Sequence, residues 1–183
     1  MLNAKNNIRS VAAAVGGAVF AFTGALQATQ DFEGTHNTID TTAEYLVTGA
    51  LPIALALTIP MYLLLGRLAR TPRARIVAVV PQIVLALMCV ISVINGEDAS
   101  FFNAVAPICL ATWLGASVVI ARGLRRTRAV PAAVALALPA LLMTTFLLSP
   151  IGGAMLTGAY WIAAASLLNR GTLVRPAGQP VAA

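Results

Sequence analysis

The chain has 183 residues, of which 59% are hydrophobic and only 10% are charged, and its formal net charge is +6. A soluble domain carries charges on about a quarter of its residues, so this composition excludes a single soluble globular domain and favours a membrane protein. The basic residues form small groups between apolar stretches, which is typical of topology signals that contact lipid headgroups and not of a nucleic-acid-binding surface.

The first apolar stretch covers about residues 10–28 and follows a short polar start. About 19 helical residues span roughly 28 Å, enough to cross the hydrocarbon core of a bilayer. A stripe of small residues recurs every four positions along it: Ala13, Gly17, Ala21 and Ala25. Such stripes let helices pack closely in lipid. A cleaved signal peptide is the alternative, but no clear cleavage site follows, so we expect a retained helix.

Five further apolar stretches follow, at about residues 45–66, 76–94, 104–121, 130–148 and 153–168. Together they predict an all-α membrane bundle of six transmembrane helices, organised as one domain over residues 1–169. Prolines interrupt four of the five stretches, and kinked helices can separate and open a pocket. The Pro- and Gly-containing segment 170–183 is expected to be a disordered tail.

The charged residues segregate between alternate gaps. The N-terminal segment has two basic residues, the second and fourth gaps have four each, and the C-terminal segment has two. The other three gaps have none. The positive-inside rule therefore predicts that both termini and the arginine loops are cytoplasmic. The acids, with the single histidine, lie in the first and third gaps and are expected to form an outer acidic mouth: Asp31, Glu33, His36, Asp40, Glu44, Glu97 and Asp98.

Residues His36, Asp40 and Glu44 are four apart, so a helical turn would stack them and could hold a cation or a metal ion. A single histidine argues against zinc, and no EF-hand spacing is present. The sequence Thr41-Thr-Ala-Glu44 matches a capping box, in which both side chains satisfy free amides at a helix start. We favour capping over a metal site. Asn103 is expected to cap the fourth helix in a similar way.

No ionisable acid, base or histidine lies inside the six stretches, which argues against a proton-driven pump. Gln82 follows a proline and is a candidate for facing a cavity. Trp113, Tyr160 and Trp161 lie at mid-span and are candidates for an aromatic pocket for a lipophilic or cationic ligand. We expect the pocket to open outward, beneath the acids. A tightly packed bundle without a pocket is the alternative.

Catalytic chemistry has little support. Cys89 and Cys109 belong to no CxxC motif and are expected to be buried apolar residues, and no nucleophile signature accompanies the lone histidine. The sequence therefore favours a non-enzymatic protein, without a cofactor, that binds or passes a small molecule. Two alternatives are an accessory subunit that docks on a larger membrane partner through the stripe of the first helix, and a metal-dependent membrane enzyme built on the outer acids.

Two short segments, Asn95-Gly96-Glu97-Asp98 with Ser100-Phe101-Phe102 and Gly158-Ala159-Tyr160-Trp161, resemble parts of small, functionally unassigned six-helix membrane proteins common in actinobacterial genomes. The resemblance implies an integral location in a bacterial plasma membrane. It supplies no catalytic residue.

Overall fold

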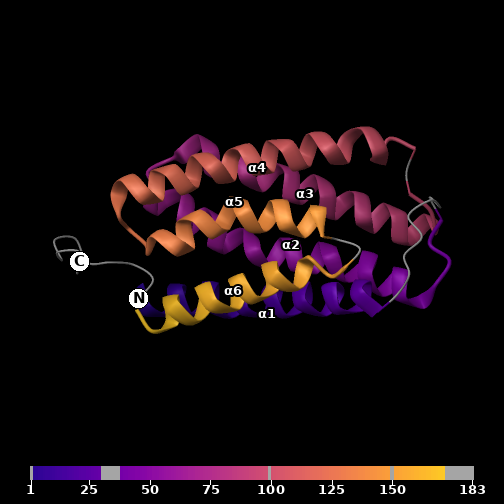
Figure 1. Cartoon of the computed structure of the whole chain (residues 1–183), viewed down its shortest axis with the longest axis horizontal. Coiled ribbons are helices and arrows are strands. Elements are labelled where there is room, and N and C mark those ends of the chain that lie inside the picture. The colour runs from indigo at the N-terminus through magenta and orange to yellow at the C-terminus, as the bar shows by residue number, and fades with distance from the viewer. Residues whose placement is uncertain (1, 30–37, 99, 149–150, 172–183) are drawn as a thin grey trace.

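The computed structural model describes residues 2–29, 38–98, 100–148 and 151–171, and this part of the chain is all-helical, as predicted. The helices lie side by side along the long axis of the molecule (Figure 1). They are α1 (Leu2–Thr29), α2 (Thr42–Leu68), α3 (Pro72–Asn95), α4 (Phe102–Thr127), α5 (Ala132–Leu147) and α6 (Ala154–Asn169).

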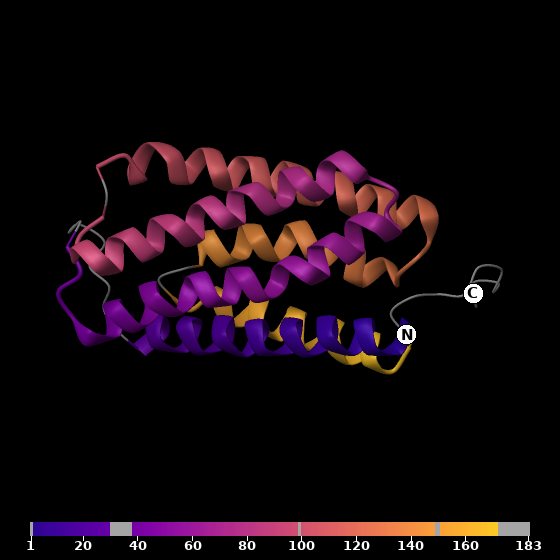
Figure 2. The same ribbon diagram turned by 180° about the vertical axis from the view of Figure 1, so that it is seen from behind.

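The helices fall into two length classes. Helices α1 to α4 have 24 to 28 residues, and each has a stretch that is long and apolar enough to cross a membrane. Helices α5 and α6 are more apolar on average but have only 16 residues each. Figures 1 and 2 both show the α5–α6 hairpin turning back before it reaches the far end of the bundle.

Most helices extend beyond the predicted apolar stretches. The first begins at Leu2, not near residue 10, and the fourth ends at Thr127, not near residue 121. Hydropathy marks only the apolar part of a helix, whereas the backbone hydrogen bonds continue into polar flanks. The predicted cap at Asn103 was wrong, because α4 begins at Phe102, its N-cap position is Phe101, and no side chain caps it.

The helices form a closed ring in sequence order, because each packs on the next and α6 packs back on α1. Helix α2 also contacts α4 across the ring. The α1–α6 pair is the most extensively packed, and the α4–α5 and α5–α6 pairs are the least packed among sequence neighbours. Helix α5 is therefore the most loosely held member of the ring.

Glycines explain the tight α1–α6 contact. A Cβ atom added at Gly158 would lie 2.5 Å from the carbonyl oxygen of Gly17, and one added at Gly17 would lie 2.7 Å from that of Gly158. The Ser10 hydroxyl donates a hydrogen bond of 2.8 Å to the carbonyl of Ala165 nearby. The small-residue stripe predicted on the first helix thus packs against α6 of the same chain, so a partner could dock on it only by displacing α6.

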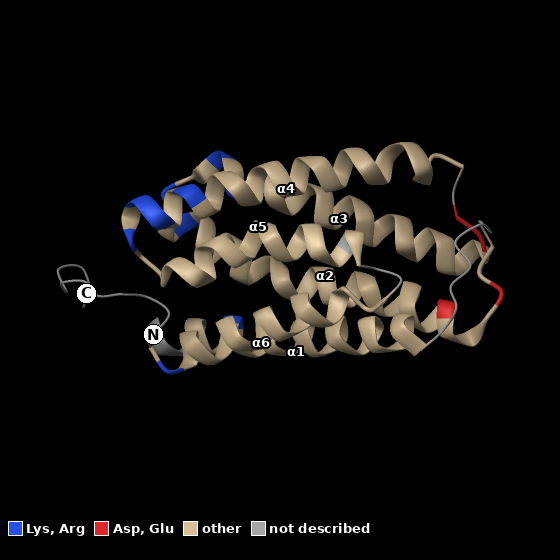
Figure 3. Ribbon diagram, viewed as in Figure 1, with Lys and Arg blue, Asp and Glu red and all other residues tan. Residues whose placement is uncertain are grey.

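The charged residues lie at opposite ends of the bundle (Figure 3). The arginine end carries the connections from α2 to α3 and from α4 to α5, together with the start of α1 and the end of α6. The acid end carries the described residues Asp40, Glu44, Glu97 and Asp98. Charge segregation along the sequence is therefore charge segregation in space.

Candidate functional site

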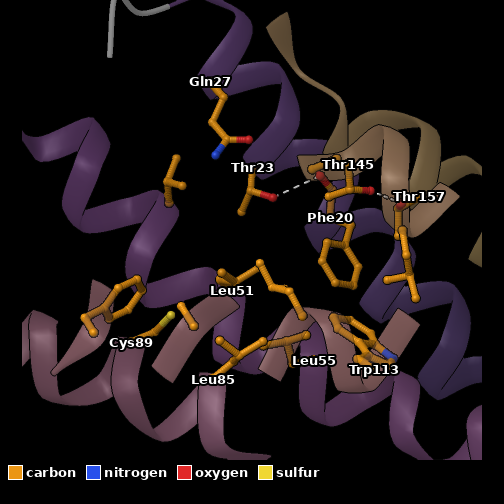
Figure 4. Close-up of a pocket in the computed structure, with 16 residues that line it drawn as sticks. Phe20, Thr23, Gln27, Leu51, Leu55, Leu85, Cys89, Trp113, Thr145 and Thr157 are labelled. Atoms are coloured by element: carbon orange, nitrogen blue, oxygen red, sulfur yellow. Dashed lines mark hydrogen bonds between the residues drawn. The ribbon is translucent and has the colours of Figure 1, made fainter. Parts of the chain in front are cut away.

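A cavity of about 270 Å³ lies in the acid-end half of the bundle, inside the ring (Figure 4). All six helices contribute to its wall. Each does so from the half that is nearer the acid end: α1 through Thr23, α2 through Leu51, α3 through Cys89, α4 through Trp113, α5 through Thr145 and α6 through Thr157. We call this cavity the ring pocket.

The wall of the ring pocket is mostly apolar, and none of its side chains is an acid or a base. Its polar side chains come from three neighbouring helices, α1, α5 and α6: Thr23, Gln27, Thr145 and Thr157. Figure 4 shows them together on one side of the cavity, opposite Leu51, Leu55 and Leu85. The pocket surface is therefore almost wholly apolar, with a few hydroxyl-bearing side chains grouped on one side.

The threonine hydroxyls use their protons within the protein. Thr23 donates to the carbonyl of Phe20 at 2.9 Å, and Thr145 lies 2.7 Å from the carbonyl of Leu141. Thr157 is hydrogen-bonded to Thr145 and lies 3.3 Å from the same carbonyl. A hydroxyl has two acceptor lone pairs besides its single proton. These hydroxyls therefore retain lone pairs that can accept a hydrogen bond from a hydroxyl or amide of a ligand.

Aromatic side chains close the ring pocket on its arginine-end side. The Tyr62 ring lies 5.9 Å from that of Trp113 and 5.1 Å from that of Trp161, measured between centroids, and Trp161 packs edge-on against Tyr160 at 4.9 Å. Of these four side chains only Trp113 lines the pocket. Trp161 lies one turn deeper along α6 than Thr157, and Tyr62 lies two turns deeper along α2 than Leu55.

Beyond this aromatic cluster the bundle is densely packed. Five fully buried hydrophobic side chains lie farther toward the arginine end than the pocket residues on the same helices: Met61, Leu65, Ile120, Leu124 and Leu138. The ring pocket is thus blind toward the arginine end. Two polar atoms beside the cluster, Trp113 Nε1 and Ser117 Oγ, are buried and make no hydrogen bond of good geometry within the described part of the chain. Both interact with the Tyr62 hydroxyl, which is their nearest polar partner in the cluster.

Gln82 does not line the ring pocket. It is fully buried in the contact between α2 and α3, where its amide nitrogen donates to the carbonyl of Ala78 at 2.9 Å and its oxygen accepts from Thr58 at 3.3 Å. Of the four pocket candidates from the sequence, then, Trp113 forms part of the wall, Tyr160 and Trp161 lie behind it, and Gln82 joins two helices.

The capping box predicted at the start of α2 is confirmed. The Glu44 carboxylate accepts from the backbone amides of Asp40 and Thr41, both at 2.8 Å, and the Thr41 hydroxyl accepts from the Glu44 amide at 3.2 Å. Asp40 accepts from the Thr38 hydroxyl at 2.8 Å. Both carboxylates therefore serve the local geometry of a helix start.

The two acidic gaps meet in space. Residues Thr38 and Glu97 form an antiparallel bridge, and the Ile39 amide donates to the carbonyl of Gly96 at 2.8 Å. Asp98 accepts from the Ser92 hydroxyl, also at 2.8 Å. The predicted mouth residues Asp31, Glu33 and His36 lie outside the described residues. Within the described ranges, no three His, Cys, Asp or Glu side chains are grouped to hold a metal ion.

Both cysteines are buried free thiols, as predicted. Sequence reasoning missed most of the pocket wall, including Phe20, Leu51 and Leu55, and it missed Tyr62 at the centre of the aromatic cluster. Thr23 and Thr145 bond back to a carbonyl of their own helix, whereas Thr157 bonds across to α5. Their position in the wall of the ring pocket depends on which helix faces converge, and the sequence does not carry that information.

Comparison with family models, with curated proteins and with solved structures finds no match to this chain. Its class therefore rests on the fold and the pocket: a helix ring, with four members able by length and composition to cross a membrane, around a largely apolar cavity.

Proposed function

We propose that this is a multi-pass protein of the bacterial plasma membrane, with six spans and cytoplasmic termini, that binds a small uncharged lipophilic molecule in the ring pocket. The observation that carries the proposal is the pocket itself, which receives side chains from all six helices and no charged group. Apolar walls with a few convergent polar groups are the usual chemistry of small-molecule sites.

The size of the pocket limits the ligand. An apolar protein cavity of about 150 Å³ accommodates benzene, so by proportion 270 Å³ accommodates about ten to twelve non-hydrogen atoms. The acceptor wall made by Thr23, Thr145 and Thr157 adds a second requirement, a hydrogen-bond donor at one end of the molecule. A medium-chain alcohol or amide meets both conditions. An uncharged wall also makes a neutral ligand a better match than a cation.

Binding is better supported than passage. A molecule that crossed the protein would have to displace Tyr62 and the packed side chains behind it, whereas a bound molecule needs no such rearrangement. The accessory-subunit alternative loses its predicted docking stripe to α6. The metal-enzyme alternative is weakened because Asp40 and Glu44 form hydrogen bonds at the start of α2. A metal site at Asp31, Glu33 and His36 stays a prediction.

A direct test uses 10-bromodecan-1-ol, whose bromine quenches tryptophan fluorescence on contact. Both tryptophans are almost fully buried, with exposed fractions of 3% for Trp113 and 2% for Trp161, so probe dissolved in the surrounding bilayer or detergent reaches neither. We expect saturable quenching of the purified protein. In Ala106→Phe, which places a phenyl ring in the pocket wall on α4, quenching should be lost.

The matched control is Ala104→Phe, the same change at an exposed position on α4 that does not line the pocket. It should bind like the parent protein. The polar wall is tested by Thr157→Val, which should weaken binding of the bromoalcohol about three- to tenfold, the value of one hydrogen bond, and leave binding of 1-bromodecane unchanged. Absence of saturable quenching in the parent protein, or unaltered quenching in Ala106→Phe, would contradict the proposal.

A further inference from the structure

A second, shallower hollow lies between α4 and α5. Its wall is entirely apolar in side-chain type: Leu110, Ala111 and Leu114 on α4, and Leu142, Met143 and Leu147 on α5. Two of these residues, Leu110 and Leu142, also line the ring pocket. Leu110 and Leu142 therefore lie at the boundary between the interior cavity and the outer hollow.

The helices at this boundary are the ones best able to move. The α4–α5 and α5–α6 contacts are the least extensive between sequence neighbours in the ring. Helix α5 also contains Pro139, three residues before Leu142. Proline cannot donate to the carbonyl four residues earlier, and a helix bends most easily at such a position. A small outward movement of α5 would separate Leu142 from Leu110.

We propose that the α4–α5 face is a lateral opening through which the ligand passes between the bilayer and the ring pocket, with Leu110 and Leu142 as its gate. The inference rests on the proposed function. The occupant of the outer hollow is then the apolar chain of that ligand, during passage or where the chain is too long for the interior cavity. We assign the outer hollow to the ligand because it shares Leu110 and Leu142 with the ring pocket.

A ligand could reach the ring pocket from the bilayer, between α4 and α5, or from the acid end of the bundle. The chemistry of the two routes favours the first. A lipophilic molecule concentrates in the bilayer and not in water. The outer hollow presents only apolar side chains on a face where Met143 and Leu147 are 44% and 71% exposed. At the acid end, by contrast, the bridge between Thr38 and Glu97 ties together the segments that lead into α2 and α4.

Exchange kinetics test the opening separately from the site. In Ala111→Phe a phenyl ring is added in the outer hollow, at a residue that does not line the ring pocket. We expect association and dissociation of 10-bromodecan-1-ol, followed by stopped-flow quenching, to slow by a common factor of about ten, corresponding to about 1.4 kcal/mol in the barrier. The Kd should be unchanged, because this probe is within the size that the ring pocket accommodates and does not need to extend into the outer hollow when bound.

Ala104→Phe is the matched control, seven residues away and so on the same face of α4, and its rates should equal those of the parent. A second pair on α5 makes the test independent of one variant: Met143→Phe in the hollow and Leu136→Phe outside it, both exposed to similar extents. Parent-like rates in both hollow variants, with normal binding, would overturn the lateral opening and leave the proposed function standing. Absence of binding in the parent would overturn both.

Discussion

Two buried serines show how differently one side-chain type can be used in this bundle. Ser10 donates a hydrogen bond from α1 to the carbonyl of Ala165 on α6, whereas the Ser117 hydroxyl has no partner with hydrogen-bond geometry among the described residues. Both side chains are almost completely buried, with exposed fractions of 6% and 0%. Their environments therefore differ in hydrogen bonding more than in exposure.

We expect Ser10→Ala to destabilise the protein by about 0.6 kcal/mol, the average for hydrogen bonds between membrane helices. Ser117→Ala should cost less than this, because the Ser117 hydroxyl makes no hydrogen bond of good geometry and interacts only with the Tyr62 hydroxyl. Unfolding in mixed detergent micelles, followed by far-UV circular dichroism, measures both. Equal losses of stability would show that the Ser117 hydroxyl is satisfied, for example by a bound water molecule.

For individual residues, interactions within one short segment were predictable from the sequence, whereas sites built by residues from several helices were not. The capping box of Thr41 and Glu44 involves residues three apart, so the sequence contains the whole interaction. The ring pocket involves residues on six helices that are apolar on nearly every side. In such helices hydrophobic periodicity does not mark the inward face, and this is why Gln82 was a pocket candidate and Leu51 was not singled out.

Among the elements, the α1–α6 pair is the most extensively packed and closes the ring. Gly17 and Gly158 allow it, and the carbonyl of each occupies the space that a Cβ on the other would need. The sequence showed one side of this contact, the small-residue stripe on the first helix. It did not show that the other side is α6 of the same chain. Nothing in the spacing of Ala13, Gly17 and Ala21 distinguishes a contact within the chain from a contact with another protein.

Gly158→Ala should therefore destabilise the bundle by about 1–3 kcal/mol, the usual cost of overpacking. Gly115 provides the control, because a Cβ added there meets no atom within 4 Å. Gly115→Ala in the middle of α4 should be stabilising by up to about 1 kcal/mol through helix propensity. Thermal unfolding in detergent distinguishes the two, and a Gly158→Ala protein as stable as the parent would contradict the close approach.

For the whole molecule, segregation of charge to the two ends is the feature that sequence and structure share most directly. Arginines occupy one end of the bundle and the described acids the other (Figure 3), as the alternation of charged gaps predicted. The order of helices around the ring, and the interior space that it encloses, depend on packing between faces and did not follow from that alternation.

The proposed orientation is tested by cysteine labelling with a membrane-impermeant maleimide added to intact cells. Glu97→Cys, at the acid end, should label, whereas Arg73→Cys and Arg126→Cys should label only after lysis. The native Cys89 and Cys109 are buried and should stay unlabelled. Labelling of the arginine-end positions in intact cells would reverse the orientation.

The short α5–α6 hairpin has a consequence for the membrane around the protein. Sixteen helical residues measure about 24 Å, whereas the hydrocarbon core of a typical bilayer is about 30 Å thick. In the proposed orientation the lipids beside α5 and α6 must thin to match them, while those beside α1 to α3 need not. The bilayer would then be dimpled on one flank only, the flank that also contains the α4–α5 face. The lipid composition, which sets the bilayer thickness, would then affect α5 directly. A thin bilayer would reduce the mismatch at the α5–α6 hairpin, and a thick bilayer would increase it.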